Sequence, residues 1–83
     1  MNLCFFIGKV VSDVKFDFII NGKNISVARF DLELSNKSII TVKAYNDLAD
    51  YCYNSINKNN RIFTYGVVNS TYEILVKKII ILD

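Results

Sequence analysis

One stretch of helical periodicity lies inside a chain that otherwise alternates like β-strands, and this constrains the fold more than any other feature. The apolar positions of this stretch recur as on one face of a short helix, at Leu48, Ala49, Cys52, Tyr53 and Ile56. Asn46 or Asp47 stands just before it, where a side-chain oxygen can accept the free amides of a first helical turn. No other segment has a helical pattern, so the sequence predicts a single helix that interrupts a run of strands.

Three strands are predicted before the helix. The first covers about Leu3 to Val11. Lys15 to Ile20 alternates less cleanly and leads into Asn21-Gly22, the strongest short hairpin signal, because both positions accept a positive φ. The chain returns in a strand over about Ile25 to Leu34, and another strand runs from Ser38 to Tyr45.

The last two of these strands have the two-residue period of a strand with one buried face. The predicted inward side chains are Ala28, Phe30, Leu32, Leu34, Ile40, Val42 and Ala44, and the outward ones are Arg29, Asp31, Glu33, Ile39, Thr41, Lys43 and Tyr45.

Two more strands follow the helix, Arg61 to Val68 and Tyr72 to Leu82, joined around Asn69-Ser70. The order strand, strand, strand, helix, strand, strand is that of the OB fold. We therefore predict one all-β domain over residues 1–83, a five-stranded OB barrel with one short α-helix between strands 3 and 4 that covers one barrel end. Such barrels bind oligonucleotides or oligosaccharides.

The composition indicates a self-associating protein. Of the 83 residues, 52% are hydrophobic, more than a barrel of this size can bury, so we expect a homodimer or homotetramer. No apolar run could span a bilayer, and the N-terminus lacks the features of a signal peptide. Cys4 and Cys52 are expected to pack as small hydrophobes. We expect a cytoplasmic location and no membrane contact.

Catalysis is not indicated. The chain has no His, which removes a common general base and the commonest metal ligand. Asp31 and Glu33 share one strand face and could act as an acid and base pair, but solvated surface charges are the better interpretation. The three glycines stand alone and form no phosphate-binding loop. We predict a protein that is not an enzyme and has no cofactor or metal site.

Binding of single-stranded nucleic acid requires cations that follow the phosphates and aromatic faces on which unstacked bases can lie. The outward face of the central hairpin offers both, with Arg29, Thr41, Lys43 and Tyr45. Tyr45 is the main stacking candidate, and its alternative role is to cover the barrel end. Further candidates from the first part of the chain are Lys9, Lys15, Phe16 and Phe18, and core packing explains the two Phe residues equally well.

Several short segments match one known family in their order and spacing. They are Asn2 to Val10, Asn21-Gly22 with Val27 to Leu32, Thr41 to Tyr45 with Leu48-Ala49, Asn57 to Asn59 with Tyr65 to Val67, and Tyr72-Glu73. Through them the chain resembles the bacterial single-stranded DNA-binding proteins. The resemblance implies an OB-fold dimer or tetramer that coats single-stranded DNA without sequence preference in replication, recombination or repair. It also implies that Tyr45 stacks on a base. The residues themselves leave RNA open as an alternative ligand.

The chain departs from this family in three respects. Ile39 stands where members often have a stacking Trp, the loops after the third strand and around Asn69 are shorter, and the tail with an acidic tip that recruits replication proteins is missing after Asp83. Weaker binding over a shorter site is expected. One alternative is a tail-less dimer, like the primosomal replication proteins, that also bridges proteins. Another is an OB module that binds only protein, favoured by Asp31 and Glu33, which repel phosphates.

Overall fold

The computed structural model describes residues 3–20, 24–70 and 72–83, which form six strands and one helix. The elements are β1 (Leu3–Val10), β2 (Lys15–Ile20), β3 (Asn24–Leu34), β4 (Ile39–Tyr45), α1 (Asp47–Ser55), β5 (Arg61–Ser70) and β6 (Glu73–Ile81).

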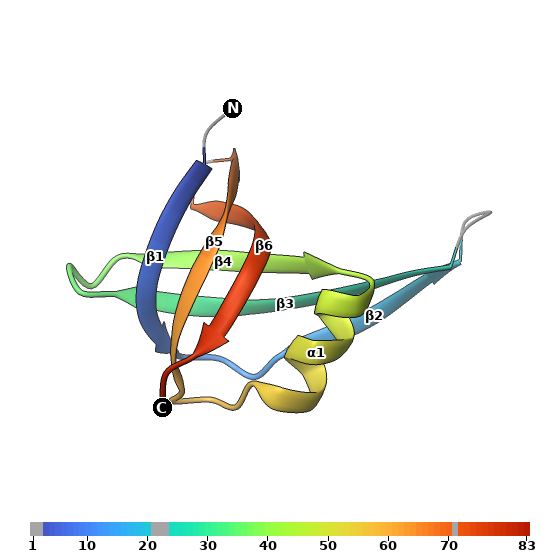
Figure 1. Ribbon diagram of the computed structural model, residues 1–83, viewed down its shortest axis with the longest axis horizontal. Coiled ribbons are helices and arrows are strands. Elements are labelled where there is room, and N and C mark those ends of the chain that lie inside the picture. Colours follow the sequence, from blue (N-terminus) through green and yellow to red (C-terminus); the bar gives the residue numbers. More distant parts are fainter. Residues whose placement is uncertain (1–2, 21–23, 71) are drawn as a thin grey trace.

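Five of the strands close into a barrel. They pair in the order β1-β5-β6-β4-β3, and β1 also pairs with β3 to complete the ring. The β4–β6 pair is parallel and the other pairs are antiparallel. The helix lies between β4 and β5, which are the third and fourth strands of the barrel (Figure 1). The predicted OB fold is therefore confirmed.

The second strand, β2, stays outside the barrel. It pairs only with β3, and the two extend away from the barrel as a long hairpin (Figure 1). The predicted turn at Asn21-Gly22 lies outside the described residues, and the pair Ile20↔Asn24 on either side of it fits a hairpin there. At eleven residues, β3 is long enough to pair with β2 at one end and with β1 at the other.

A short irregular segment separates β1 from β2 and is attached to the middle of β3. The Val11 N–H donates to the Asp31 carbonyl at 3.0 Å, and the Asp31 N–H donates to Ser12 Oγ at 2.8 Å. These bonds satisfy both backbone groups of Asp31 on the edge where no strand pairs with it. The barrel strand β1 therefore ends at Val10, and this attached segment leads the chain into β2 outside the barrel.

The core fills the barrel and extends under the helix. The buried apolar side chains include Val10, Ala28, Phe30, Leu32, Val42, Ala44, Ala49, Cys52, Ile56, Ile62, Ile74 and Val76. Along β3 and β4 they are the residues that the alternating pattern predicted, with Leu34 half-buried at the strand end. Tyr53 was expected on the apolar stripe of the helix, but it is 57% exposed, because the stripe that reaches the core is narrower and consists of Ala49 and Cys52.

The helix begins without the predicted side-chain cap. Asn46 occupies the cap position with φ 58°, and its side chain makes no capping hydrogen bond. The Asn46 backbone instead donates to the Ser26 carbonyl at 2.9 Å and accepts from the Asp50 N–H at 3.0 Å. The start of the helix is therefore fixed by a backbone bond to β3.

The last hairpin turns two residues later than predicted. Asn69 and Ser70 belong to β5, and Ser70 pairs with Glu73. The Asn69 side chain donates to Glu73 Oε1 at 2.8 Å, which ties the end of β5 to the start of β6. Tyr72 therefore lies in the turn, with φ 68°, and not in the strand.

No helix in the described part of the chain has the length and apolar character needed to cross a membrane.

Candidate nucleic-acid interface

Three cations line up across three neighbouring strands on the outer face of the sheet. Lys15 on β2 pairs directly with Arg29 on β3, and Arg29 pairs directly with Lys43 on β4. Paired residues point to the same face and neighbouring strands lie about 4.8 Å apart, so the three side chains form one row about 10 Å long. We call it the cation row. Lys15 and Arg29 are exposed, and Lys43 is half-buried.

The main aromatic candidate lies next to this row. Tyr45 is two residues beyond Lys43 on the same face of β4 and pairs with Val27 of β3. Its side chain is 39% exposed, and it points outward from the barrel. Tyr45 and the cation row therefore belong to one continuous surface, as the two-residue period predicted.

A row of hydrogen-bond acceptors runs along the other side of the cation row. Asp31 pairs with Thr41, which pairs in turn with Glu73 of the parallel strand β6. The Thr41 hydroxyl donates to Asp31 Oδ1 at 3.2 Å. Glu73 Oε2 lies 3.9 Å from Lys43 Nζ, a weak ion pair because the two charged atoms are too far apart for a direct hydrogen bond. We call Asp31, Thr41 and Glu73 the acceptor row.

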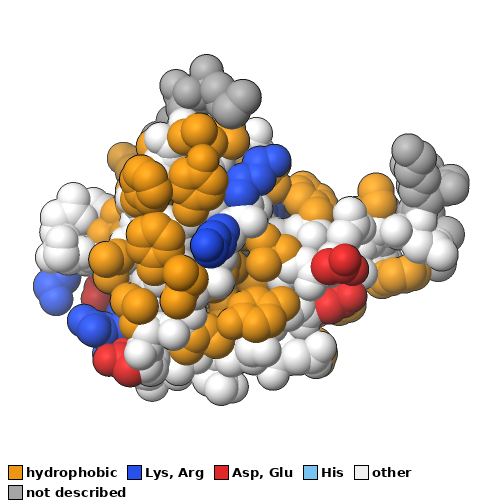
Figure 2. Space-filling model, in the orientation of Figure 1, with side chains coloured by type: hydrophobic (Ala, Val, Ile, Leu, Met, Phe, Trp, Pro, Cys, Tyr) orange, Lys and Arg blue, Asp and Glu red, His pale blue; other side chains and the backbone are white. Residues whose placement is uncertain are grey.

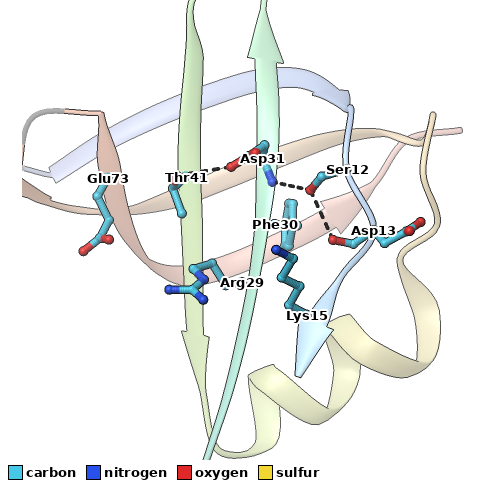
Figure 3. Close-up of a pocket in the computed structure, with 8 residues that line it drawn as sticks. All are labelled: Ser12, Asp13, Lys15, Arg29, Phe30, Asp31, Thr41 and Glu73. Atoms are coloured by element: carbon cyan, nitrogen blue, oxygen red, sulfur yellow. Dashed lines mark hydrogen bonds between the residues drawn. The ribbon is translucent and has the colours of Figure 1, made fainter. Parts of the chain in front are cut away.

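Lys15 and Arg29 of the cation row, the acceptor row and the segment between β1 and β2 border a hollow of about 350 Å³. Figure 3 shows its lining, with Ser12 and Asp13 on one side and Thr41 and Glu73 on the other. The remaining lining residues are Lys15, Arg29, Phe30 and Asp31. Donor and acceptor side chains therefore face the same space.

Lys9 lies on the outer face at some distance from the cation row. It pairs with Glu33 on β3 and with Arg61 on β5. Glu33 is four residues from Arg29 on the same strand face, which corresponds to about 13 Å. The structure therefore groups Arg29, Lys43, Lys15, Thr41 and Tyr45 but leaves Lys9 apart.

The structure places Phe16 and Phe18 on the opposite face from Arg29, so the prediction that they share its surface is wrong. Phe16 pairs with the buried Ala28, and Phe18 pairs with Ser26. The Phe16 ring packs on Tyr53 of the helix, with centroids 5.0 Å apart, whereas Phe18 is 55% exposed on the projecting hairpin. The physical reason is the strand alternation: since Lys15 faces outward opposite Arg29, residues 16 and 18 must point to the other side.

The sequence analysis missed Tyr72 as a surface aromatic near the hollow. It is 68% exposed, and its carbonyl accepts the Thr41 N–H at 2.7 Å. Its backbone therefore lies beside Thr41, but its side chain lines a separate small pocket with Phe6, Ile40 and Val68. The parallel pairing of β4 with β6, which brings Tyr72 there, has no signature in the local sequence.

A second surface, apolar and distinct from the first, covers β1 and β5. Directly opposed pairs on its outer side are Leu3 with Val67, Phe5 with Tyr65 and Ile7 with Phe63. Phe5 is 66% exposed and has ring centroids 5.9 Å from Phe63 and 5.2 Å from Tyr65. Figure 2 shows apolar side chains gathered over this part of the molecule. We call the six residues the apolar ladder.

Neither cysteine is placed for chemistry. Burial raises the pKa of the Cys52 thiol to about 12, so Cys52 stays protonated and is a poor nucleophile at neutral pH. Cys4 is half-buried in β1, and both cysteines are free thiols. In the described ranges, His, Cys, Asp and Glu form no cluster of three that could hold a metal ion.

Solved structures share this architecture. The SSB domain of a protein from Synechococcus sp. matches with a TM-score of 0.83 at 18% identity, over 95% of this chain and 93% of that one. The chain has the fold of a single-stranded DNA-binding domain. The second single-stranded DNA-binding protein of Mycobacterium smegmatis matches with a TM-score of 0.79 at 15% identity, over 98% and 88% of the two chains. A small single-stranded DNA-binding protein from Streptomyces coelicolor gives 0.77 at 16%, over 98% and 94%.

The similarity to single-stranded DNA-binding domains lies in the fold and not in the sequence. No protein-family profile matches the chain, and no curated protein matches it by sequence. The structural matches confirm the resemblance seen in the short segments at the level of the fold, which is the OB fold of single-stranded DNA-binding domains.

Proposed function

We propose that this protein binds single-stranded DNA through the outer face of β2, β3 and β4, without catalysing a reaction. The observation that carries the proposal is the cation row. Like charges directly opposite each other on neighbouring strands destabilise a sheet, and here two such pairs lie side by side. A phosphate backbone placed along the row removes this repulsion.

The surroundings of the row suit a single strand better than a duplex. Tyr45 offers an aromatic face beside the cations. An unstacked base gains about 1 to 3 kcal/mol on such a face, and the bases of a duplex cannot reach it. Phosphates on Lys15, Arg29 and Lys43 with a base on Tyr45 make a short site. Contacts with the phosphate backbone of the nucleic acid dominate this binding, so it requires no particular base sequence.

We further propose that the protein is a homo-oligomer associated through the apolar ladder. The three exposed β1 side chains are 46%, 66% and 56% exposed, an apolar surface that favours association. In addition, β1 pairs with β3 only from Gly8 to Val10, so among the described residues the outer edge of β1 before Gly8 has no strand beside it. A second copy of this chain could pair with that edge and cover the ladder. A dimer is the minimum assembly, and a tetramer needs one more contact surface.

The free thiols of Cys4 and Cys52 fit a reducing compartment, and we propose that the protein acts in the cytoplasm, in replication, recombination or repair.

The proposal is tested by titration of a fluorescent oligo-thymidine of about 35 nucleotides, long enough for several OB folds. Anisotropy is read at low and moderate salt, with duplex DNA and oligo-uridine of equal length as controls. We expect binding to the single strand only, with a slope of log affinity against log salt of about −2, since three cations contribute roughly 0.7 each. No binding at low salt would contradict the proposal and favour the protein-only module. Equal or tighter binding of oligo-uridine would move the proposal to RNA.

A further inference from the structure

The acceptor row needs an explanation on a surface that attracts phosphates. Asp31 and Glu73 line the hollow together with Lys15 and Arg29, and their negative charges oppose phosphate binding there. A surface that only followed the backbone would gain affinity without them. The hollow is therefore better suited to a group that donates as well as accepts hydrogen bonds.

An unstacked base is such a group. The hollow, at about 350 Å³, lies within the size range of small-ligand sites. Bases of a bound single strand can leave the stack and present their edges to side chains. The hollow also lies beside the cation row, since Lys15 and Arg29 line it and Thr41 is two residues from Lys43 on β4, so a base of a strand held by that row falls next to it.

The mixture of side chains distinguishes among the four bases. Guanine carries the O6 and N7 acceptors, which suit Arg and Lys, and its N1–H and amino group donate to a carboxylate. Cytosine and adenine each have an amino group but no ring N–H beside it, so they offer a carboxylate one donor group and not two. Thymine has no amino group. Guanine is the base that presents two adjacent donors, N1–H and the amino group, to both oxygens of the Asp31 carboxylate while two adjacent acceptors, O6 and N7, face Arg29 and Lys15.

We propose that this hollow receives one guanine base of the bound strand, with Arg29 and Lys15 donating to its O6 and N7 edge and Asp31 accepting from its N1 and amino hydrogens. This inference rests on the proposed function, because it concerns a strand that the cation row already holds. It adds a modest base preference at one position to binding that is otherwise led by the phosphates.

The test compares nine-nucleotide thymidine oligomers that carry one central guanine, adenine, cytosine or inosine with the all-thymidine oligomer. We expect the guanine oligomer to bind about fivefold tighter than all-thymidine, the lower end of what one well-placed pair of hydrogen bonds to a base gives. Inosine lacks the amino group and should lose part of this gain. If purine stacking were the cause, adenine would gain as much as guanine, and that result would overturn the proposal.

A matched pair of variants assigns the preference to Asp31. Asp31→Asn removes the charge but keeps an oxygen that can accept the Thr41 hydroxyl, so the fold should hold. Glu33→Gln removes the same charge from the same face of β3, two residues away and outside the hollow. Both variants should bind all-thymidine slightly tighter, and only Asp31→Asn should bind guanine and thymidine oligomers equally.

The two levels of the proposal fail in different ways. If the wild-type protein binds no oligomer, the proposed function itself is wrong. If it binds all-thymidine but shows no preference for guanine, or if Asp31→Asn keeps the preference, only the base site is wrong. Should Asp31→Asn fail to fold, the inosine and adenine oligomers on the wild-type protein still decide.

Discussion

Arg29 and Lys43 lie directly opposite each other on β3 and β4, with both side chains on the outer face. Lys15 stands opposite Arg29 on its other side. Selection for stability alone would place opposite charges at these positions, because cross-strand ion pairs stabilise a sheet and like charges destabilise it. Glu73 already pairs with Lys43 at 3.9 Å, and under the proposed function a bound phosphate relieves the repulsion that remains at Arg29 and Lys15.

This relationship predicts a variant that is at least as stable as the wild type but binds less well. Arg29→Gln should leave the melting temperature unchanged or raise it, because it removes repulsion from both neighbours. The same change should weaken binding of oligo-thymidine and reduce the salt slope by about 0.7. Lys58→Gln is the control, since Lys58 is an exposed cation in the loop before β5, outside the cation row. A drop in stability with unchanged affinity would show that Arg29 has a structural role.

Tyr45→Ala should weaken binding of single-stranded DNA by about 1 to 3 kcal/mol without unfolding the protein, and Tyr45→Phe should bind like the wild type. Tyr51→Ala is a matched control, because Tyr51 is 40% exposed on the helix and Tyr45 is 39% exposed on the proposed site. Fluorescence titration measures affinity, and circular dichroism checks the fold. Full affinity in Tyr45→Ala would remove the stacking claim.

Phe5→Glu should convert the proposed oligomer to monomers, because it places a charge in the middle of the apolar ladder, next to Phe63 and Tyr65. Phe18→Glu changes another exposed Phe, 55% against 66% for Phe5, on the projecting hairpin and should leave the assembly intact. Light scattering coupled to gel filtration gives the mass of each variant. A wild-type protein that is already monomeric at high concentration would contradict the proposed interface.

Gly8→Ala should destabilise the barrel by about 1 to 3 kcal/mol, the usual cost of overpacking. Gly8 pairs with Leu34 on one side and Ile62 on the other, at the point where β1 joins both β3 and β5. A Cβ there would lie 2.5 Å from the Glu33 carbonyl oxygen, a backbone atom that cannot easily move. Urea unfolding measures the change, and Ser35→Ala in the exposed turn after β3 should stay within about 0.5 kcal/mol of wild type.

The buried thiol predicts a loss of stability at high pH. Cys52 keeps its proton in the folded state until about pH 12, whereas in the unfolded chain it titrates near its ordinary pKa of 9.0. Above that pKa the folded state binds more protons than the unfolded one, so stability should fall as the pH rises from 9 toward 12. Cys52→Ala should show a shallower fall, measured by urea unfolding at pH 8 and pH 10. Parallel falls in the two proteins would show that Cys52 does not contribute.

The sequence alone was sufficient to predict the elements whose apolar residues recur at a regular spacing. The two-residue period of β3 and β4 predicted which side chains face the core, and the single helical stripe predicted where the helix interrupts the strands. These patterns are set by burial of one face, which acts at every position of the element.

The errors concerned one strand face and the pairing of distant strands. The surface role of Phe16 was one error: Lys15 and Phe16 are neighbours on one strand and point to opposite faces, so only one of them could lie beside Arg29. The parallel pairing that places Glu73 and Tyr72 beside Thr41 depends on the whole barrel closing. Only the three-dimensional structure shows that the acceptor row exists.

The parallel contact between β4 and β6 also determines when the barrel can form. In the chain, β4 and β6 are separated by the helix and by β5. The strand β1 likewise cannot form its pairs with β5 until β5 has been synthesised. Contacts of this kind close long loops and slow folding. During synthesis, the cation row can be complete once β4 has left the ribosome, while the barrel beneath it stays open until β6 emerges. We therefore expect the nascent chain to be exposed to chaperones through nearly all of its translation.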